Sequence, residues 1–161
     1  MSGAQYYDDI QVGDRFESQS YKMTIGEIRD FANKFDPQPF HLDEEAARAS
    51  IFGGLVASGW HTAAVTMRLL ISSNPFAGGL VGSAVEVRWE RPTRPGDDIS
   101  VFTEVIERRP HRSRTDRGVV VIRAETRNSD GEVLQSLISR FLIERRPVGL
   151  ASDVPSSGVA L

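Results

Sequence analysis

The chain is organised around residues 36–60, which read DPQPFHLDEEAARASIFGGLVASGW. A carboxylate, Asp36, and an imidazole, His41, stand five residues apart on a segment that two prolines stiffen. A turn of two glycines follows, and an apolar helix then begins at Ser58 or Gly59. An acid, a base and the start of a helix therefore fall within one short stretch.

Two helices are predicted after the proline segment. Asp43 can cap a short one over residues 44–50, in which Glu44 and Arg48 have the spacing of a surface ion pair. The other begins after the glycine turn, extends to about Ser73 and is apolar on nearly all sides. Its apolar residues are Trp60, Ala63, Ala64, Val65, Met67, Leu69, Leu70 and Ile71. Because a helix of this kind belongs in an interior, we expect a sheet to enclose it.

The N-terminal part predicts one strand, over residues 15–23, and one helix. Thr24 followed by Glu27 is a capping box that starts the helix. Pro37 disfavours helical geometry at Asp36, so the helix ends there and presents the carboxylate at the mouth of a loop. The expected buried face comprises Ile25, Ile28, Phe31, Ala32 and Phe35.

The second half of the chain has the two-residue period of β-strands. Over residues 85–89, apolar and charged residues alternate, which is typical of a half-buried strand. A turn at residues 92–97 follows, and Asp130-Gly131 is a strong hairpin signal. Further strands are predicted over residues 99–105, 119–127 and 133–144. Helices collected on one side of an antiparallel sheet indicate an α+β domain.

Composition excludes several classes of protein. The formal net charge of −3 is not the basic footprint of a nucleic-acid-binding protein. No cysteine is present, which rules out a disulfide framework and a thiol nucleophile and fits a reducing cytoplasm. The three histidines have no paired spacing, so we expect no metal site.

Length and hydropathy favour one domain without a membrane span. At 161 residues the chain suits a single domain, expected over residues 1–146, and residues 147–161 are expected to form a flexible tail because they are rich in Pro, Ser and Gly. The uncharged stretches 51–67 and 69–85 are too polar and glycine-rich to cross a membrane. The polar, acidic N-terminus does not look like a signal peptide. We therefore expect a cytoplasmic protein.

The proline loop and the helix start together resemble the hydratase motif of the MaoC-like, (R)-specific enoyl-CoA hydratase family. That family's usual pattern is Asp-x-Asn-Pro-x-His, followed by a central helix that starts at a glycine. Here Asp36-Pro37-Gln38-Pro39-Phe40-His41 is followed, eighteen residues after the histidine, by Gly59 within Ser58-Gly59-Trp60. The resemblance covers roughly residues 10–145 and includes a Pro-Gly-Asp turn at residues 95–97. It implies a single hotdog domain, an antiparallel sheet wrapped around a long central helix.

The resemblance also implies roles for particular residues. Asp36 and His41 would be an acid–base pair acting on one water, and the Gly59 N–H would be the oxyanion-hole donor. His61 and Thr62 either line the pocket or serve the helix start. The basic loop around residues 108–117 either holds the phosphates of coenzyme A or is simply solvated. The further candidates for substrate binding are Ser58, Trp60, His61, Arg112 and Arg114.

Three positions depart from the family's pattern. Gln38 replaces the usual Asn, and Ser58 stands where a His often precedes the glycine. Met67 aligns with a serine that the best-known hydratases carry two turns into the central helix. All three bear on how the loop with Asp36 and His41 is held.

The function implied by the resemblance is that of a reversible hydro-lyase. Such an enzyme adds water to a trans-2-enoyl-CoA and gives a (3R)-3-hydroxyacyl-CoA. No cofactor is expected, because coenzyme A is part of the substrate, and a homodimer or a multiple of dimers is expected from pairing of sheet edges. Two alternatives stay open: an acyl-CoA thioesterase with the same fold, and a non-catalytic hotdog subunit.

Overall fold

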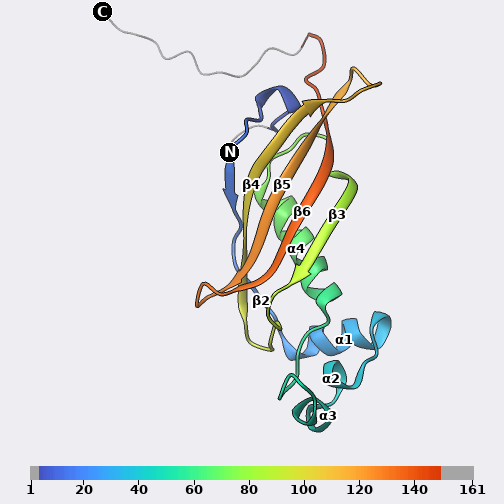
Figure 1. Ribbon diagram of the computed structural model, residues 1–161, viewed down its shortest axis with the longest axis vertical. Coiled ribbons are helices and arrows are strands. Elements are labelled where there is room, and N and C mark those ends of the chain that lie inside the picture. Colours follow the sequence, from blue (N-terminus) through green and yellow to red (C-terminus); the bar gives the residue numbers. More distant parts are fainter. Residues whose placement is uncertain (1–3, 150–161) are drawn as a thin grey trace, which may run out of the picture.

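The computed structural model of the chain describes residues 4–149 and combines an antiparallel sheet with a set of helices (Figure 1). Most of the predicted C-terminal tail, residues 150–161, lies outside the described residues. The helical elements are η1 (Tyr7–Asp9), α1 (Ile25–Phe35), α2 (Pro39–Leu42), α3 (Glu44–Ala49) and α4 (Gly59–Ser73). The strands are β1 (Arg15–Glu17), β2 (Tyr21–Lys22), β3 (Val81–Trp89), β4 (Asp98–Pro110), β5 (Arg117–Asn128) and β6 (Val133–Glu144).

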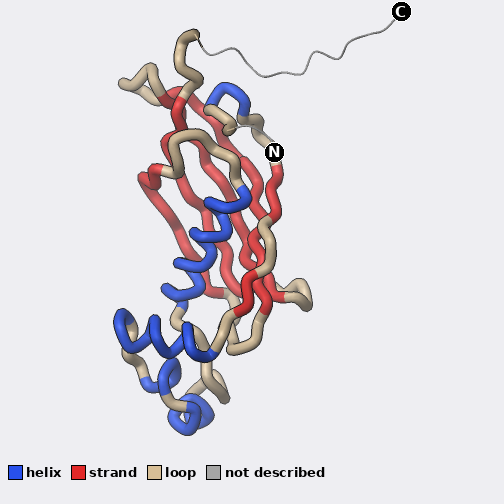
Figure 2. The backbone as a smooth tube through the Cα atoms, turned by 180° about the vertical axis from the view of Figure 1, so that it is seen from behind, coloured by secondary structure: helices blue, strands red, loops and turns tan. Residues whose placement is uncertain are grey.

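The strands form a sheet in the order β1-β4-β5-β6-β3, and β2 also pairs with β4. All of these pairings are antiparallel. Helix α4 lies along one face of the curved sheet, and α1, α2 and α3 gather at one end, beside the start of α4 (Figures 1 and 2). The predicted α+β hotdog fold is therefore confirmed. None of the helices in residues 4–149 is long and apolar enough to cross a membrane.

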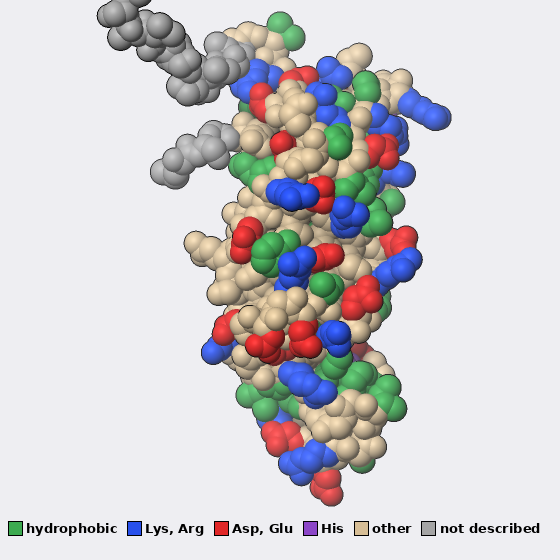
Figure 3. Space-filling model, turned by 60° about the vertical axis from the view of Figure 1, so that its left-hand side comes forward, with side chains coloured by type: hydrophobic (Ala, Val, Ile, Leu, Met, Phe, Trp, Pro, Cys, Tyr) green, Lys and Arg blue, Asp and Glu red, His purple; other side chains and the backbone are tan. Residues whose placement is uncertain are grey.

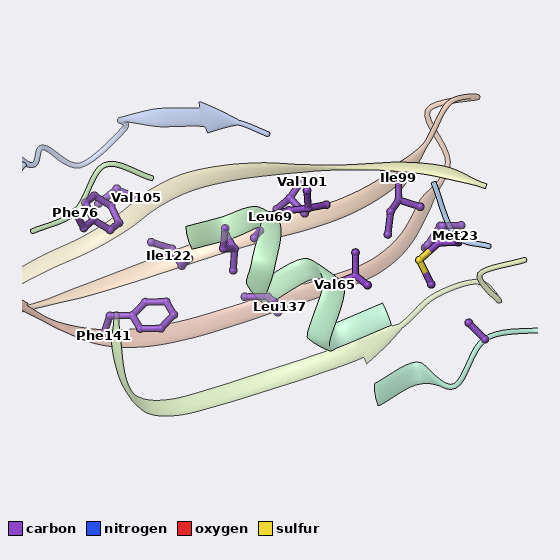
Figure 4. Packing of buried hydrophobic residues seen from close by; sticks show 14 of the residues in the cluster. Met23, Val65, Leu69, Phe76, Ile99, Val101, Val105, Ile122, Leu137 and Phe141 are labelled. Carbon is purple, nitrogen blue, oxygen red and sulfur yellow. The ribbon is translucent and has the colours of Figure 1, made fainter. Parts of the chain in front are cut away.

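The register of the strands decides which side chains face α4. Directly paired residues of an antiparallel ladder lie on the same face of the sheet. Val105 of β4 pairs with Ile122 of β5, and both are buried. Val65 and Leu69 of α4 belong to the same buried cluster (Figure 4), and so does Leu70. Because each such side chain contributes about 1.5–3 kcal/mol on burial, the contact between helix and sheet is the core of the domain.

One side of α4 is not enclosed. Trp60, Met67 and Ile71 recur on one face of the helix and are exposed. Beside them, β3 is an edge strand that pairs with β6 alone within the described residues, and its Val85 is exposed too. The strand predicted over residues 85–89 is confirmed as part of β3, but of its expected inward residues only Val87 is partly buried, whereas Val85 and Trp89 are exposed. The alternation of side chains is present, but no further strand or helix within residues 4–149 covers this edge.

The capping signals of the sequence are confirmed. Thr24 caps α1, its hydroxyl accepting a hydrogen bond from the Glu27 N–H while the Glu27 carboxylate bonds back to Thr24. Asp43 caps α3 by accepting from the Ala46 N–H at 2.7 Å. Asp36 is the C-cap residue of α1, as Pro37 predicts.

Two N-terminal expectations need correction. The predicted strand over residues 15–23 is divided into β1 and β2, because Ser18 lies inward and its hydroxyl accepts a hydrogen bond from the Val101 N–H, which interrupts the regular ladder. The predicted apolar face of α1 is only partly buried. Ile28 and Ala32 are fully buried. Ile25 and Phe35, at the two ends of that face, are exposed because no other element among the described residues covers them.

Candidate active site

The end of α1 and the single turn of α2 bring Asp36 and His41 together. The Asp36 N–H still bonds to the Ala32 carbonyl, but the backbone then leaves the helix. Pro39 suits the first turn of α2. An N–H at this position would have no partner within the helix, and proline has no N–H. The turn carries His41 back toward the acid, and its Nε2 lies 3.2 Å from the Asp36 Oδ2.

The tautomer of His41 follows from its second contact. The ring is buried, and its Nδ1 lies 2.8 Å from the Val56 carbonyl oxygen. Because a carbonyl only accepts, Nδ1 must carry the hydrogen. A neutral His41 therefore presents an unprotonated Nε2 beside the Asp36 carboxylate. Two adjacent acceptors of this kind can each take one hydrogen from the same water molecule.

The Asp36 carboxylate is held by two hydrogen bonds. Its Oδ2 accepts from the Ser58 hydroxyl at 2.6 Å, and its Oδ1 accepts from the Gln38 amide at 2.7 Å. Burial by itself would raise the pKa of Asp36, but the bonds from Ser58 and Gln38, together with the attraction of the neighbouring His41 when it is protonated, lower it below its usual value. The carboxylate therefore stays ionised at neutral pH. Gln38 and Ser58, two of the positions that depart from the family's pattern, hold the loop.

Gly59 begins α4 beside this pair. Its N–H belongs to the first turn, where helix donors have no intrahelical partner, and it makes no hydrogen bond among the described residues. The partial positive charge of a helix N-terminus adds to this donor. The position also requires glycine, since a Cβ there would approach the Trp89 ring to 2.6 Å. The Trp89 indole N–H donates to the Gly59 carbonyl at 2.9 Å.

Asp36, His41 and Gly59 border one cavity of about 480 Å³. This volume lies within the usual range of small-molecule sites. Most of the remaining wall surface is apolar, with Phe40, Phe52, Trp60 and Trp89 among the residues that form it, and the charged side chains of Glu90 and Arg91 also line the cavity. A carboxylate, an imidazole and a free N–H in one apolar cavity can bind a polar reacting group, exchange protons with it and stabilise negative charge on it.

The other residues predicted near the helix start take different positions. Ser58 is fully buried and serves as the N-cap of α4, so that it supports Asp36 and does not form a wall of the cavity. His61 faces away and stacks on Phe31, with ring centroids 4.8 Å apart. Burial lowers the pKa of His61, although the Glu27 carboxylate opposes the effect.

Thr62 lines the cavity and also serves the start of α4, so both roles considered for it are present. Its hydroxyl lies 2.9 Å from that of Thr93 and so ties the start of α4 to the loop between β3 and β4. Phe40, Phe52 and Thr93 were not predicted as site residues. Phe40 lies inside the recognised motif, but nothing in the sequence connects Phe52 or Thr93 with it.

The basic loop lies far from this cavity along the chain's long axis. Arg112 and Arg114 belong to the β4–β5 hairpin, at the end of the sheet opposite α1, α2 and α3 (Figure 1). Arg114 is paired with Asp116 at 3.1 Å. Within one chain the structure therefore does not bring these two arginines to the site.

Charged side chains elsewhere on the sheet are mixed in sign. Figure 3 shows basic and acidic groups interspersed over one side of the molecule. On β4 and β5, Glu104 accepts from Arg123 at 3.0 Å and also lies 3.5 Å from Arg15. No group of three or more His, Asp or Glu side chains suited to a metal ion occurs within residues 4–149.

The fold and the site define the class: a hotdog protein with an aspartate and a histidine side by side near the start of its central helix. Comparison with known proteins specifies the family, because the model of the MaoC-like domain matches residues 9–128. The chain belongs to the MaoC-like dehydratase domain family.

Three similar proteins illustrate this membership. The crystal structure of a MaoC-like dehydratase from Rhodospirillum rubrum is 50% identical, with a TM-score of 0.87 over 90% of this chain and 100% of that one. The uncharacterized protein YdeM of Bacillus subtilis is 29% identical over 75% of this chain and 86% of its own length. The 3-hydroxybutyryl-CoA dehydratase of Methylorubrum extorquens is 31% identical over 68% of this chain and 69% of its own length.

Proposed function

We propose that the protein is a hydro-lyase that reversibly adds water to a trans-2-enoyl-CoA and forms a (3R)-3-hydroxyacyl-CoA. The strongest support is the shared cavity of the Asp36 carboxylate, the His41 imidazole and the Gly59 N–H. Membership of the family supports hydratase or dehydratase chemistry, and the Methylorubrum extorquens relative carries the name of such an enzyme. The (3R) configuration follows the resemblance alone. No cofactor is required, because coenzyme A is part of the substrate.

The proposed reaction begins with one water held between Asp36 and His41. The water donates one hydrogen to the carboxylate and the other to the His41 Nε2. Its oxygen then bonds to the β-carbon of the enoyl group while an O–H proton passes to the Nε2. The Asp36 carboxylate, 3.2 Å away, stabilises the imidazolium that results.

The second half of the reaction concerns the thioester. As the β-carbon is attacked, negative charge moves onto the thioester oxygen, where the Gly59 N–H and the N-terminus of α4 stabilise it. The imidazolium then gives its proton to the α-carbon. The new hydroxyl and the new hydrogen together account for the added water. Asp36 stays a carboxylate throughout, in keeping with its lowered pKa.

Crotonyl-CoA tests this proposal. We expect the enoyl absorbance to fall in the presence of the enzyme while a thiol reagent detects no free coenzyme A. Release of free thiol in place of hydration would overturn the proposal and favour the acyl-CoA thioesterase. The absence of both signals, also with longer enoyl-CoA esters, would favour the non-catalytic subunit.

We also propose that the protein forms a homodimer, or a multiple of dimers, by pairing along β3. Among residues 4–149 this edge strand has a neighbour on one side only, and an unpaired edge is a template for another strand. Its Val81 and Val85 add exposed apolar side chains. Sedimentation is expected to give an even number of chains, and Val85→Glu to favour the monomer. A monomeric parent protein would contradict this.

A further inference from the structure

Two tryptophans form a pair beside the candidate active site. Trp60 is the second residue of α4 and Trp89 is the last residue of β3, and their rings meet edge to face with centroids 5.1 Å apart. The side chains border the cavity, yet they are 61% and 46% exposed. Large indoles that remain exposed next to a polar site are not explained by core packing, and exposed aromatic surface commonly marks binding.

A second cavity lies further along the same seam between α4 and β3. Its volume is about 360 Å³, and its walls are mainly apolar, with Met67, Leu70, Val85, Leu137 and Phe141 among them. The two cavities have no wall residue in common. From Trp60 to Met67 the helix advances by roughly 10 Å, so this apolar space lies further along α4 than the tryptophan pair.

The position of Trp89 relative to Gly59 limits the space that is available to the acyl chain. The indole lies flat against the Gly59 Cα, where even a methyl group would collide, and its N–H is fixed on the Gly59 carbonyl. If the Gly59 N–H holds the thioester oxygen, the first carbons of the acyl chain lie within a few ångströms of this ring. A longer chain would then meet the indoles directly after the reacting carbons.

We infer that the Trp60–Trp89 pair is the end wall of the acyl site and restricts the enzyme to short-chain enoyl thioesters. The inference rests on the proposed function and specifies its substrate class. The wall separates the site from the second cavity, so its removal opens a continuous apolar path along α4. Trp60 is the side chain to truncate, because its indole makes no hydrogen bond among the described residues, whereas Trp89 also anchors the Gly59 carbonyl.

The first experiment compares kcat/KM for four-carbon crotonyl-CoA and eight-carbon trans-2-octenoyl-CoA. The parent protein is expected to prefer crotonyl-CoA, and Trp60→Ala to raise the octenoyl-to-crotonyl ratio by about tenfold or more, since discrimination by a pocket wall has this magnitude. Ile71→Ala is the matched control. It removes another exposed apolar side chain from the same face of α4, outside both cavities, and should leave the ratio unchanged.

Two outcomes of this experiment overturn the inference. Equal use of both substrates by the parent protein would show that no wall exists, and an equal effect of Trp60→Ala on both substrates would show contact with the part they share. Both leave the hydratase proposal intact. A parent protein that hydrates neither ester refutes the proposed function and this inference together, so the two failures are distinguishable.

The second experiment uses the fluorescence of the pair itself. Trp60 and Trp89 are the two tryptophans of the sequence, so intrinsic tryptophan emission reports on this site alone. Butyryl-CoA, which is saturated and cannot be hydrated, is expected to shift or quench the emission, whereas coenzyme A without an acyl group is not. An equal change with both ligands would place the indoles at the coenzyme and contradict the end-wall role.

Discussion

Two polar clusters follow one another along α4, and they differ in what surrounds them. At the start of the helix, Ser58 donates to Asp36, which lies beside His41. Two of these three side chains are ionisable, and both of those border the cavity. This cluster is therefore fully bonded on the protein side and open to a ligand on the other.

The second cluster, about two turns further on, is closed. The Thr66 hydroxyl lies 2.7 Å from that of Thr126 and accepts from the Gln135 amide at 3.1 Å. All three side chains are fully buried, neutral, and absent from the walls of both cavities described above. The comparison teaches that buried polar groups of this domain differ in their surroundings: the closed cluster ties α4 to the sheet, and the open one borders the cavity in which we propose that the chemistry takes place.

Loss of either ionisable group should have the largest effect on activity. Asp36→Asn and His41→Gln keep the size of the side chain but remove the charge or the proton-accepting nitrogen. We expect each to lower kcat/KM for the enoyl thioester by about 10²–10⁴-fold, the usual contribution of general acid–base catalysis. Circular dichroism should show an unchanged fold. If both variants kept their activity, the cluster at the start of α4 would not act in the chemistry, and the proposed difference between the two clusters would be wrong.

Gly59→Ala should have the next largest effect. Its added methyl group would meet the Trp89 ring at 2.6 Å and displace either the indole or the start of α4. We expect a loss of up to about 10²-fold in kcat, because a misplaced oxyanion-hole donor costs this order of magnitude. Gly82→Ala is the matched control, since its methyl group would have an ordinary contact at 3.7 Å with Phe141.

A change in the closed cluster should affect stability and spare the chemistry. Thr66→Val keeps the shape but leaves the Gln135 amide, whose carbonyl oxygen already has no partner among the described residues, without its acceptor. We expect a loss of about 1–3 kcal/mol in the free energy of unfolding, measured with denaturant. The kcat/KM of the folded variant should stay within about twofold of the parent value, well below the effect at Asp36. If the folded variant also lost activity, the two clusters would not be independent of each other.

Ser58→Ala should have the smallest effect on activity and should appear in the titration of Asp36. The hydroxyl helps to lower the pKa of Asp36, so its removal should raise that pKa, which NMR titration of the Asp36 carboxyl carbon measures. The folded-state pKa of Asp36 lies below the unfolded value, so the carboxylate stabilises the parent protein above that value, and this contribution disappears as pH falls through the folded-state pKa. An unchanged pKa of Asp36 in the variant would exclude the role of Ser58.

Much of the fold could be predicted because its signals are local. The capping box at Thr24, the Asp130-Gly131 hairpin and the alternation along residues 133–144 each depend on a few neighbouring residues, and each prediction is confirmed. The single turn of α2 was not predicted, because four residues are too few to show a helical period. The exposure of β3 was not predicted either, because the position of a strand within a sheet depends on pairing between residues that are distant in the sequence.

The candidate site was predictable only in part, for a similar reason. The resemblance placed Asp36, His41 and Gly59 in one motif, and the structure brings them to one cavity. The bond from Ser58 to Asp36 joins residues 22 positions apart, so no local pattern reveals it. Arg114 shows that suitable chemistry alone does not place a residue in the site. Its guanidinium suits a phosphate, but its hairpin lies at the other end of the sheet from the cavity.

The contact between Trp89 and Gly59 would link the proposed assembly to the proposed chemistry. Trp89 is the last residue of β3, the edge along which we propose that two copies pair, and its indole holds the first residue of α4. A strand that is ordered by a neighbouring copy would therefore also fix the amide that we propose polarises the substrate. On this basis we expect the specific activity per chain to fall when the enzyme is diluted below its dimer dissociation constant.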